Sequence, residues 1–321
     1  MPVTVGPAIR SAIGPAIGID LGGTKTEVIG LDAAGTTRLR RRVPTPRDDY
    51  AATIGTIRDL VVAAEGELGA SASVGVGHPG SLSPRTGRVR NANSVWLNGR
   101  PFGSDLDAAL ERRVVCANDA DCLALSEAID GAGAGMATVF AVIVGTGCGG
   151  GLVVGGRLLR GGNGIAGEWG HNPLPWPAAD EWPGPACWCG QRGCIEAWLS
   201  GTALARSAEV ALGERLAASE LSARATAGDR AADAVLTRYV ERFARATATV
   251  INLFDPDVVV VGGGVSNIER LYTEVPPQWT ARVFADAVAT PLRRARHGDS
   301  SGVRGAAWLG RAALLNRSAA G

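Results

Sequence analysis

The amino-acid sequence predicts an α/β fold composed of two related domains. Apolar runs of strand length alternate with longer segments of helical periodicity, an order typical of strands packed against helices. The pattern of strand, glycine-rich turn and strand occurs at Ala16–Leu31 and again at Thr138–Val154. Since 321 residues suffice for two domains of ~150 residues each, the repeat indicates two similar domains around a cleft.

The first domain is expected at residues 18–132, after a loose N-terminal extension over residues 1–17. Its first two strands, Ala16–Leu21 and Thr24–Leu31, form a hairpin that turns at Gly22 and Gly23. A helix follows, with Asp48 or Asp49 as its N-cap and its end near Leu68. The next elements expected are strand Val74–Gly77, a helix from Ser104, strand Val114–Cys116 and helix Asp119–Asp130.

A Gly- and Ala-rich stretch at Gly131–Gly135 marks the start of the second domain, which is expected at residues 133–301. Its expected elements are strand Thr138–Val144, turn Gly145–Gly151, strand Leu152–Val154, an irregular segment Gly161–Cys194, a helical region Gly201–Phe254 and strand Val258–Val261. A last helix at 302–316, capped within Asp299–Ser301, is expected to complete the first domain.

The composition argues against several classes of protein. Its 32 basic and 31 acidic residues give a net charge of +1, without the positive excess that nucleic-acid or anionic-membrane binding requires. Lys25 is the single lysine, and the absence of a Gly-Lys pair excludes a Walker-type phosphate loop. Apolar runs stay well below the ~20 residues of a membrane span. The six cysteines do not resemble a secreted disulfide framework, so a cytoplasmic location is expected.

Three glycine-rich turns follow expected strands and are candidates for binding phosphate groups. Glycine lets the backbone approach a phosphate closely and point N–H groups at it. For each turn alone, a tight turn without a ligand is an equal alternative, but the first turn also carries an acid, a hydroxyl and the only lysine. Asp20 is expected to hold Mg²⁺ through water. The candidate residues are Asp20, Gly22, Gly23, Thr24, Lys25, Gly145, Thr146, Gly147, Gly149, Gly262, Gly263 and Gly264.

A possible metal site lies in the irregular segment. His171 precedes the sequence Cys187-x-Cys189-x4-Cys194, and together they offer three thiolates and one imidazole. That donor set suits a closed, tetrahedral, structural Zn²⁺ site. Three buried reduced cysteines are the alternative, although the Trp-, Pro- and Gly-rich segment offers little regular structure to bury them. The remaining cysteines are expected to be inert small hydrophobic residues: Cys116, Cys122 and Cys148.

Asp119 is the candidate general base. It follows strand Val114–Cys116 and begins a helix, a position where a carboxylate faces a cleft. An ordinary N-cap is the alternative, and the spacing alone slightly favours it.

Five segments carry a resemblance to a known family, which covers nearly everything from Gly18 to Leu309. They are GIDLGGTKTE (Gly18–Glu27), ANDA (Ala117–Ala120), GTGCG (Gly145–Gly149), EWGH (Glu168–His171) and CWCGQRGCIE (Cys187–Glu196). These segments resemble the ROK family of repressors, open reading frames and sugar kinases. The resemblance implies an actin-like (ribonuclease H-like) two-domain ATPase fold with a zinc-bound loop. It also implies the ATP-dependent phosphorylation of a hexose at its 6-hydroxyl.

The resemblance also implies roles for individual residues. Asp119 matches the catalytic base, and Asn118 matches a sugar-binding residue. Glu168 and Glu196 flank the metal ligands, so we expect zinc to position both carboxylates toward sugar hydroxyls. Gly80 and Asn93 are weaker candidates for sugar contacts, and Asn93 is equally suited to a loop turn. His78 and His297 are expected to be structural.

Finer segments resemble the bacterial fructokinase or mannofructokinase branch, so D-fructose is the expected substrate and fructose 6-phosphate the product. These segments are Val43–Tyr50, Asn91–Gly99, Glu168–Trp176 and His297–Leu309. Glucokinase or mannokinase activity is the alternative within the class, because isomeric hexoses differ by few hydrogen bonds. A sugar-responsive regulator is the alternative from another class; the 17 residues before Gly18 are expected to be too few for its helix-turn-helix. A homodimer is expected.

Overall fold

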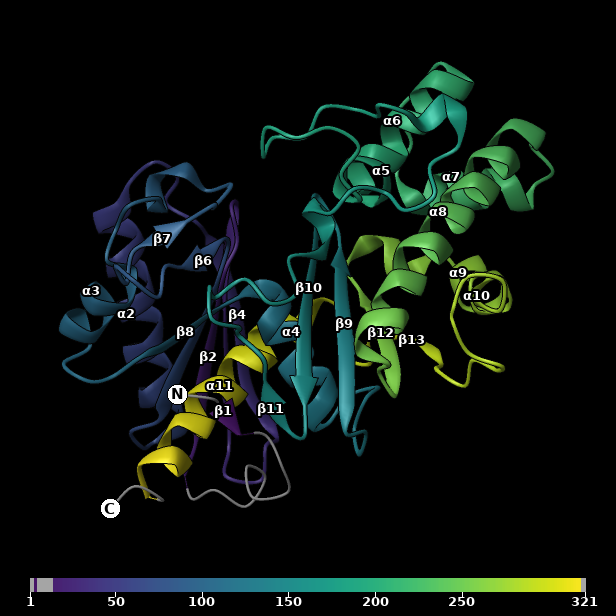
Figure 1. The fold of residues 1–321 in the computed structure, drawn as a ribbon. Helices are drawn as coiled ribbons and strands as arrows, with labels where there is room; N and C mark the ends of the chain where they lie inside the picture. The colour runs from purple at the N-terminus through teal and green to yellow at the C-terminus, as the bar shows by residue number, and fades with distance from the viewer. Residues whose placement is uncertain (1–2, 5–13, 319–321) are drawn as a thin grey trace. The chain divides into compact units, whose positions relative to one another are not determined.

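The computed structural model describes residues 3–4 and 14–318. The chain divides into two compact units, whose elements are labelled in Figure 1. Unit 1 is formed by Met1–Gly135, Gly151–Gly167 and Ser300–Gly321, as far as these residues are described, and unit 2 by Met136–Gly150 and Glu168–Asp299. The chain passes from unit 2 back to unit 1 within a single strand, β10 (Cys148–Val154).

Unit 1 is built on a five-stranded sheet with the order β4-β3-β2-β5-β8. Strands β2, β5 and β8 are parallel to one another, and β3 and β4 continue the sheet in antiparallel fashion. The strands are β2 (Ala16–Leu21), β3 (Lys25–Leu31), β4 (Thr37–Pro44), β5 (Ser73–His78) and β8 (Val115–Asn118). A two-stranded sheet, β6 (Ser81–Leu82) with β7 (Val89–Arg90), and the 3-10 turn η1 (Val95–Leu97) accompany it.

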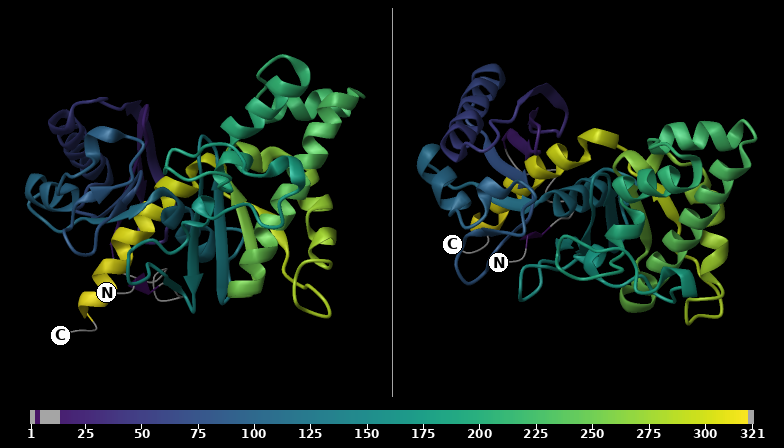
Figure 2. Two further views of the ribbon diagram at one scale, coloured as in Figure 1. Left: turned by 45° about the horizontal axis from the view of Figure 1, so that its top comes forward. Right: turned by 90° about the horizontal axis from the view of Figure 1, so that it is seen from above.

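Helices pack on this sheet through its alternating side chains. Ile17, Ile19 and Val76 join a buried cluster with residues of α2 (Tyr50–Leu68) and α3 (Phe102–Ala109). Helix α11 (Ser301–Ser318) contacts β2, β5 and α4 (Asp119–Ile129), and it runs as the long yellow helix along these strands in Figure 2.

Helix α11 lies so close to the sheet that only glycine fits beneath it. A Cβ atom on Gly18 would stand 2.1 Å from the Val303 carbonyl oxygen, and one on Gly75 would stand 2.0 Å from that of Ala306. The last helix therefore completes the core of unit 1.

The remaining strands of unit 1 are short. β11 (Arg157–Leu158) pairs antiparallel with β10 on one side and with β1 (Val3–Thr4) on the other. Gly151 packs against the backbone of α4, where an added Cβ would lie 2.5 Å from the Ala120 carbonyl oxygen. This packing groups 151–167 with unit 1, which differs from the expected assignment of 133–301 to one domain.

Unit 2 contains the parallel strands β9 (Thr138–Val144), β12 (Val258–Gly262) and β13 (Leu292–Arg294), in that order. Its longest helix is α8 (Arg230–Phe254), which contacts α5 (Glu196–Leu199), α6 (Gly201–Leu212) and α7 (Ala218–Thr226). The shorter elements are α9 (Arg270–Glu274), α10 (Pro276–Trp279) and the 3-10 turns η2 (Trp169–His171), η3 (Ala179–Glu181), η4 (Gly264–Asn267) and η5 (Gly298–Ser300).

Most expected elements agree with the structure to within a few residues, and the differences have local causes. The turn expected at Gly145–Gly151 ends at Gly147, because β10 already begins at Cys148. The helix expected from Ser104 begins at Phe102. Of the expected extension, Ala16 and Ile17 belong to β2 and Val3–Thr4 form β1; residues 1–2 and 5–13 lie outside the described residues.

Candidate active site

Two acidic residues lie at the carboxyl ends of the parallel strands in unit 1. Asp20 pairs in register with Gly77, and Gly77 with Ala117, two residues before Asp119. The Asp20 carboxylate lies close to Gly77: a Cβ added there would be 3.6 Å from Asp20 Oδ1. The carboxyl ends of parallel strands are the usual position of ligand sites in α/β proteins.

Burial raises the pKa values of both acids. Burial together with the negative charges of Asp119 and Glu27 raises the pKa of Asp20 to about 7, against the opposing charge of Arg42. Burial also raises the pKa of Asp119, whereas the hydrogen bond donated by the Ala120 N–H acts in the opposite direction. Two carboxylates whose pKa values are raised in this way form an acidic centre suited to a cation or a proton transfer.

The residue that caps α4 is Asn118, not Asp119. The Oδ1 atom of Asn118 accepts a hydrogen bond from the Asp121 N–H at 2.6 Å. Asp119 accepts a local bond, 2.8 Å long, from the N–H of the next residue, Ala120. The N-cap role that the spacing favoured for Asp119 is therefore wrong, and its carboxylate is not required to cap the helix.

The first glycine turn joins β2 to β3. The Gly22 N–H donates to the Lys25 carbonyl oxygen at 3.0 Å, and a Cβ on Gly22 would lie 2.8 Å from that oxygen. Gly23, Thr24 and Lys25 are exposed. The turn is thus tight, and its outer residues stand open to a ligand.

The other two glycine turns meet at one edge of the sheet in unit 2. Strands β9 and β12 are parallel, with Gly262 opposite Ile143, so residues 145–147 and 262–264 follow neighbouring strand ends. Gly263 has a φ of +83°, and a Cβ there would lie 2.4 Å from the Val144 carbonyl oxygen. Gly264 and Thr146 are exposed, whereas Gly262 is buried inside β12.

The four expected metal ligands come together in unit 2. One ligand atom from each of His171, Cys187, Cys189 and Cys194 lies within 4.8 Å of the others. The Cys189 and Cys194 sulfur atoms are 3.7 Å apart, as are Cys187 Sγ and His171 Nδ1. A tetrahedron with Zn–S bonds of ~2.3 Å has edges of ~3.8 Å between its sulfur atoms. The cluster therefore fits a tetrahedral ion, and burial of all three cysteines is wrong, because Cys189 is exposed.

The two acids that flank this cluster lie in different surroundings. Glu196 begins α5 and accepts hydrogen bonds from the Cys148 N–H at 2.9 Å and from Trp188 Nε1 at 2.6 Å. Glu168 precedes η2, whose Trp169 is buried and donates from Nε1 to the Gly149 carbonyl oxygen at 3.0 Å. Both acids are thereby held next to the glycine turn that follows β9.

The weaker candidates and the remaining histidines and cysteines lie in different local surroundings. Gly80 has a φ of +75°, and a Cβ there would lie 2.4 Å from the Arg90 carbonyl oxygen, while Asn93 is exposed. His78 is buried, its Nδ1 lies 2.9 Å from the Pro79 carbonyl oxygen, and burial lowers its pKa to about 4. His297 is half-buried.

The three cysteines outside the cluster, Cys116, Cys122 and Cys148, are buried and free, as expected, and burial raises the pKa of each thiol.

Sequence reasoning missed Trp188. It stands between two metal ligands, donates to Glu196 and lies edge-on to the His171 ring, with ring centroids 5.0 Å apart. The sequence signal that could have identified it is an aromatic residue between the two cysteines of the Cys-x-Cys pair.

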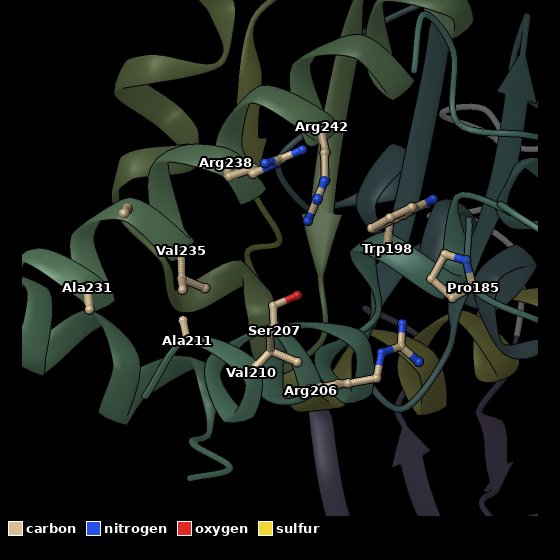
Figure 3. Close-up of a pocket in the computed structure, with 11 residues that line it drawn as sticks. Pro185, Trp198, Arg206, Ser207, Val210, Ala211, Ala231, Val235, Arg238 and Arg242 are labelled. Carbon is tan, nitrogen blue, oxygen red and sulfur yellow. The ribbon is translucent and has the colours of Figure 1, made fainter. Parts of the chain in front are cut away.

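A cavity of about 510 Å³ also lies in unit 2, between α6 and α8, apart from these residues (Figure 3). Trp198, Val235 and Arg242 line it, and the Arg242 guanidinium stacks over the Trp198 ring at 4.3 Å while donating to Glu181.

No helix among the described residues is both long and apolar enough to cross a membrane.

Comparison with known proteins identifies the family. The sequence profile of the ROK family matches residues 16–313. The chain is 40% identical over 296 residues to an N-acetyl-D-glucosamine kinase of Pectobacterium atrosepticum, covering 91% of this chain and 97% of that protein. The crystal structure of a ROK hexokinase from Thermus thermophilus is similar with a TM-score of 0.81 and 36% identity, covering 95% of this chain and 99% of that one.

A ROK glucokinase from Streptomyces griseus, solved with glucose and AMPPNP, has a TM-score of 0.74 and 29% identity over 92% of this chain and 98% of that one. These comparisons agree with the expected kinase fold. The expected fructokinase branch is not confirmed, because these relatives are kinases of N-acetyl-D-glucosamine and other hexoses. The profile match and the 40% identity show that the chain belongs to the ROK family.

Proposed function

We propose that this ROK-family sugar kinase transfers the γ-phosphoryl group of ATP to the 6-hydroxyl of a hexose, with Asp119 as the general base. The observation that carries the proposal is the half-buried acidic pair at the ends of β2 and β8. Asp119 does not cap its helix, its pKa is raised by burial, and its negative charge helps to raise the pKa of Asp20.

Phosphoryl transfer requires positioned substrates, neutralised phosphate charge and an acceptor for the hydroxyl proton. In this proposal Asp119 accepts the proton from the sugar hydroxyl as the oxygen attacks. A base whose pKa is raised toward the working pH holds that proton more readily as the transition state forms. Asn118 presents its side chain beside the base, with Oδ1 fixed by the Asp121 N–H.

The nucleotide is assigned to the three glycine turns. Gly145 and Gly264 have no atom within 4 Å of the position of an added Cβ, so phosphate oxygens can approach their backbone. Lys25 and Thr24 add a charge and a hydroxyl at the first turn. Asp20 fits Mg²⁺, since a carboxylate beside a second carboxylate is a donor set suited to a hard cation. When bound, Mg²⁺ neutralises charge on the phosphate oxygens.

The sugar is assigned to Glu168 and Glu196, with Asn118, Gly80 and Asn93 as further contacts. The four-residue Cys/His cluster fits Zn²⁺, which would act as a structural ion that holds the segment from His171 to Cys194. Carboxylates held on that segment can accept hydrogen bonds from sugar hydroxyls.

N-acetyl-D-glucosamine is the proposed preferred sugar, because the curated relative that is 40% identical is named for it. D-fructose is the second candidate, because Asn91–Gly99 and Glu168–Trp176 resemble the fructokinase branch. A cytoplasmic location is proposed from the cysteine pattern, since all six cysteines are free.

A coupled assay of ADP release, run with N-acetyl-D-glucosamine, fructose, mannose and glucose, tests the proposal. The expected result is turnover that requires Asp119, with the highest kcat/KM for N-acetyl-D-glucosamine. A higher kcat/KM for fructose would favour the second candidate. Sugar binding without turnover of any of the four would instead support a sugar-responsive regulator.

A further inference from the structure

Trp188 occupies an unusual position for a tryptophan. Trp188 is 61% exposed, so burial in the hydrophobic core does not explain a tryptophan at this position. Its backbone is fixed on both sides by Cys187 and Cys189 of the metal cluster. Its indole N–H donates a hydrogen bond of 2.6 Å to the carboxylate of Glu196.

That hydrogen bond restrains the orientation of Glu196. An N–H···O distance of 2.6 Å is slightly shorter than the ~2.7–2.9 Å typical of charge-assisted hydrogen bonds. The second oxygen of Glu196 accepts from the Cys148 N–H at 2.9 Å. With each oxygen tied to a different donor, the carboxylate cannot rotate, and a carboxylate has lone pairs for about two further donors.

The ring of Trp188 is itself held from one side. It meets the His171 ring edge-on, with centroids 5.0 Å apart and planes at 87°. The donor therefore comes from a side chain positioned by three of the metal-cluster residues. The same carboxylate also contacts the glycine turn: a Cβ on Gly147 would lie 2.8 Å from Glu196 Oε2.

We propose that Trp188 is a positioning residue that orients Glu196 for a ligand rich in hydroxyl groups and thereby sets the affinity for the sugar. The proposal rests on the function proposed above, which assigns Glu196 to the sugar. Two donors of this chain fix the carboxylate, and the ligand's hydroxyl groups take its remaining lone pairs. Orienting an acceptor in advance increases affinity because less freedom is lost on binding.

Trp188→Phe tests the proposal, since it keeps an aromatic ring beside His171 but removes the N–H donor. The expected result is a rise of about tenfold in the KM and Kd for the sugar, with KM for ATP and bound zinc unchanged. If Trp188 had a merely structural role, the variant would lose thermal stability or zinc, and the ratio of the sugar KM to the ATP KM would not change. Trp182→Phe is the matched control, because Trp182 lies in the same segment and is 75% exposed.

A second measurement does not depend on turnover. In ¹⁵N-labelled protein, the indole resonance lost in Trp188→Phe identifies Trp188, and the Cys148 amide resonance reports the orientation of Glu196. We expect Trp188→Phe to shift the Cys148 amide and Glu196→Gln to shift the Trp188 indole. An unchanged Cys148 amide, or an unchanged sugar KM in an active variant, would overturn the proposal. A wild-type protein that turns over no sugar would refute the proposed function, whereas the two resonances would still decide the role of Trp188.

Discussion

The backbone N–H of Cys148 donates a hydrogen bond of 2.9 Å to Oε2 of Glu196, joining residues that are 48 positions apart in the sequence. Cys148 begins β10 directly after a glycine turn, and Glu196 begins α5 two residues after the last cysteine of the Cys/His cluster. One carboxylate thus connects the segment assigned to zinc with the turn assigned to the nucleotide.

Replacing Glu196 should weaken sugar binding more than ATP binding. In Glu196→Gln the side-chain amide has a single acceptor oxygen, so either the Cys148 N–H or the Trp188 N–H loses its partner. We expect the sugar KM to rise at least tenfold and stability to fall by about 1 kcal/mol. Steady-state kinetics and thermal denaturation measure the two effects; an unchanged sugar KM contradicts the assignment of Glu196.

Replacing Asp119 should abolish turnover without weakening nucleotide binding. Asp119→Asn keeps the shape of the side chain but removes the proton acceptor, so kcat should fall by ~10²–10⁴-fold. Calorimetry with a non-hydrolysable ATP analogue should give an unchanged Kd. Asp59→Asn, at an exposed position on α2, is the control. Retained turnover in Asp119→Asn would remove this residue from the role of base.

The raised pKa of Asp20 predicts a pH dependence of stability. Its folded-state pKa of about 7 lies above the usual 3.8, so the folded state retains a proton that the unfolded state has already released. Without Mg²⁺, this carboxyl group therefore lowers stability as pH rises from about 4 to about 7, and the loss is complete above pH 7. Asp20→Asn should melt at a higher temperature than wild type at pH 8, with the difference vanishing near pH 4.

Thermal denaturation at both pH values checks this expectation. Added Mg²⁺ should raise the melting temperature of the wild type at pH 8 and should have less effect on Asp20→Asn, because the cation stabilises the ionised carboxylate. A difference between variant and wild type that is the same at pH 4 and pH 8 would show that Asp20 does not titrate in this window.

Removing one metal ligand tests whether the metal supports the sugar site. Cys189→Ser should lose bound zinc, measured by elemental analysis, and should raise the sugar KM while changing the KM for ATP less. Cys116→Ala, at a buried cysteine away from the cluster, should keep its zinc. Zinc loss without any change in sugar KM would separate the metal from the positions of Glu168 and Glu196.

The close packing of α11 on the sheet gives a stability prediction. Gly18→Ala would place a Cβ 2.1 Å from the Val303 carbonyl oxygen and 2.6 Å from the Ala307 nitrogen. The helix has to move to relieve this overlap, so we expect a loss of 1–3 kcal/mol or more. Urea denaturation measures it. Gly66→Ala in α2, where nothing lies within 4 Å of the added atom, should not destabilise the protein.

The sequence predicts those parts of the fold that depend on local pattern. Apolar runs identified β2, β5, β9 and β12, and Asp49 caps α2 as its position suggested. Strand β4 was missed because Thr37–Pro44 carries four arginines and buries only Leu39. Two of its arginines, Arg40 and Arg42, ion-pair with Glu27 on the neighbouring strand, a partner that no local pattern reveals.

The candidate site likewise has features that the sequence predicts and features that it does not. Spacing and family resemblance grouped the four candidate metal ligands, and the structure brings these residues together, because they lie within one segment of the chain. The Asp20–Asp119 pair and the Trp188–Glu196 bond could not be predicted in this way. The first depends on the register of three strands, and the second on how a loop folds back on itself.

The place of α11 in unit 1 has a consequence for synthesis on the ribosome. The strands that hold Asp20 and Asp119 are complete by residue 118, but the helix that covers Gly18 and Gly75 comes from the last twenty residues or so. One face of the sheet in unit 1 therefore stays uncovered until residues 301–318 have been synthesised and have left the ribosome. Truncation near residue 300 should therefore leave a protein that is captured by chaperones rather than one that lacks only a terminal helix.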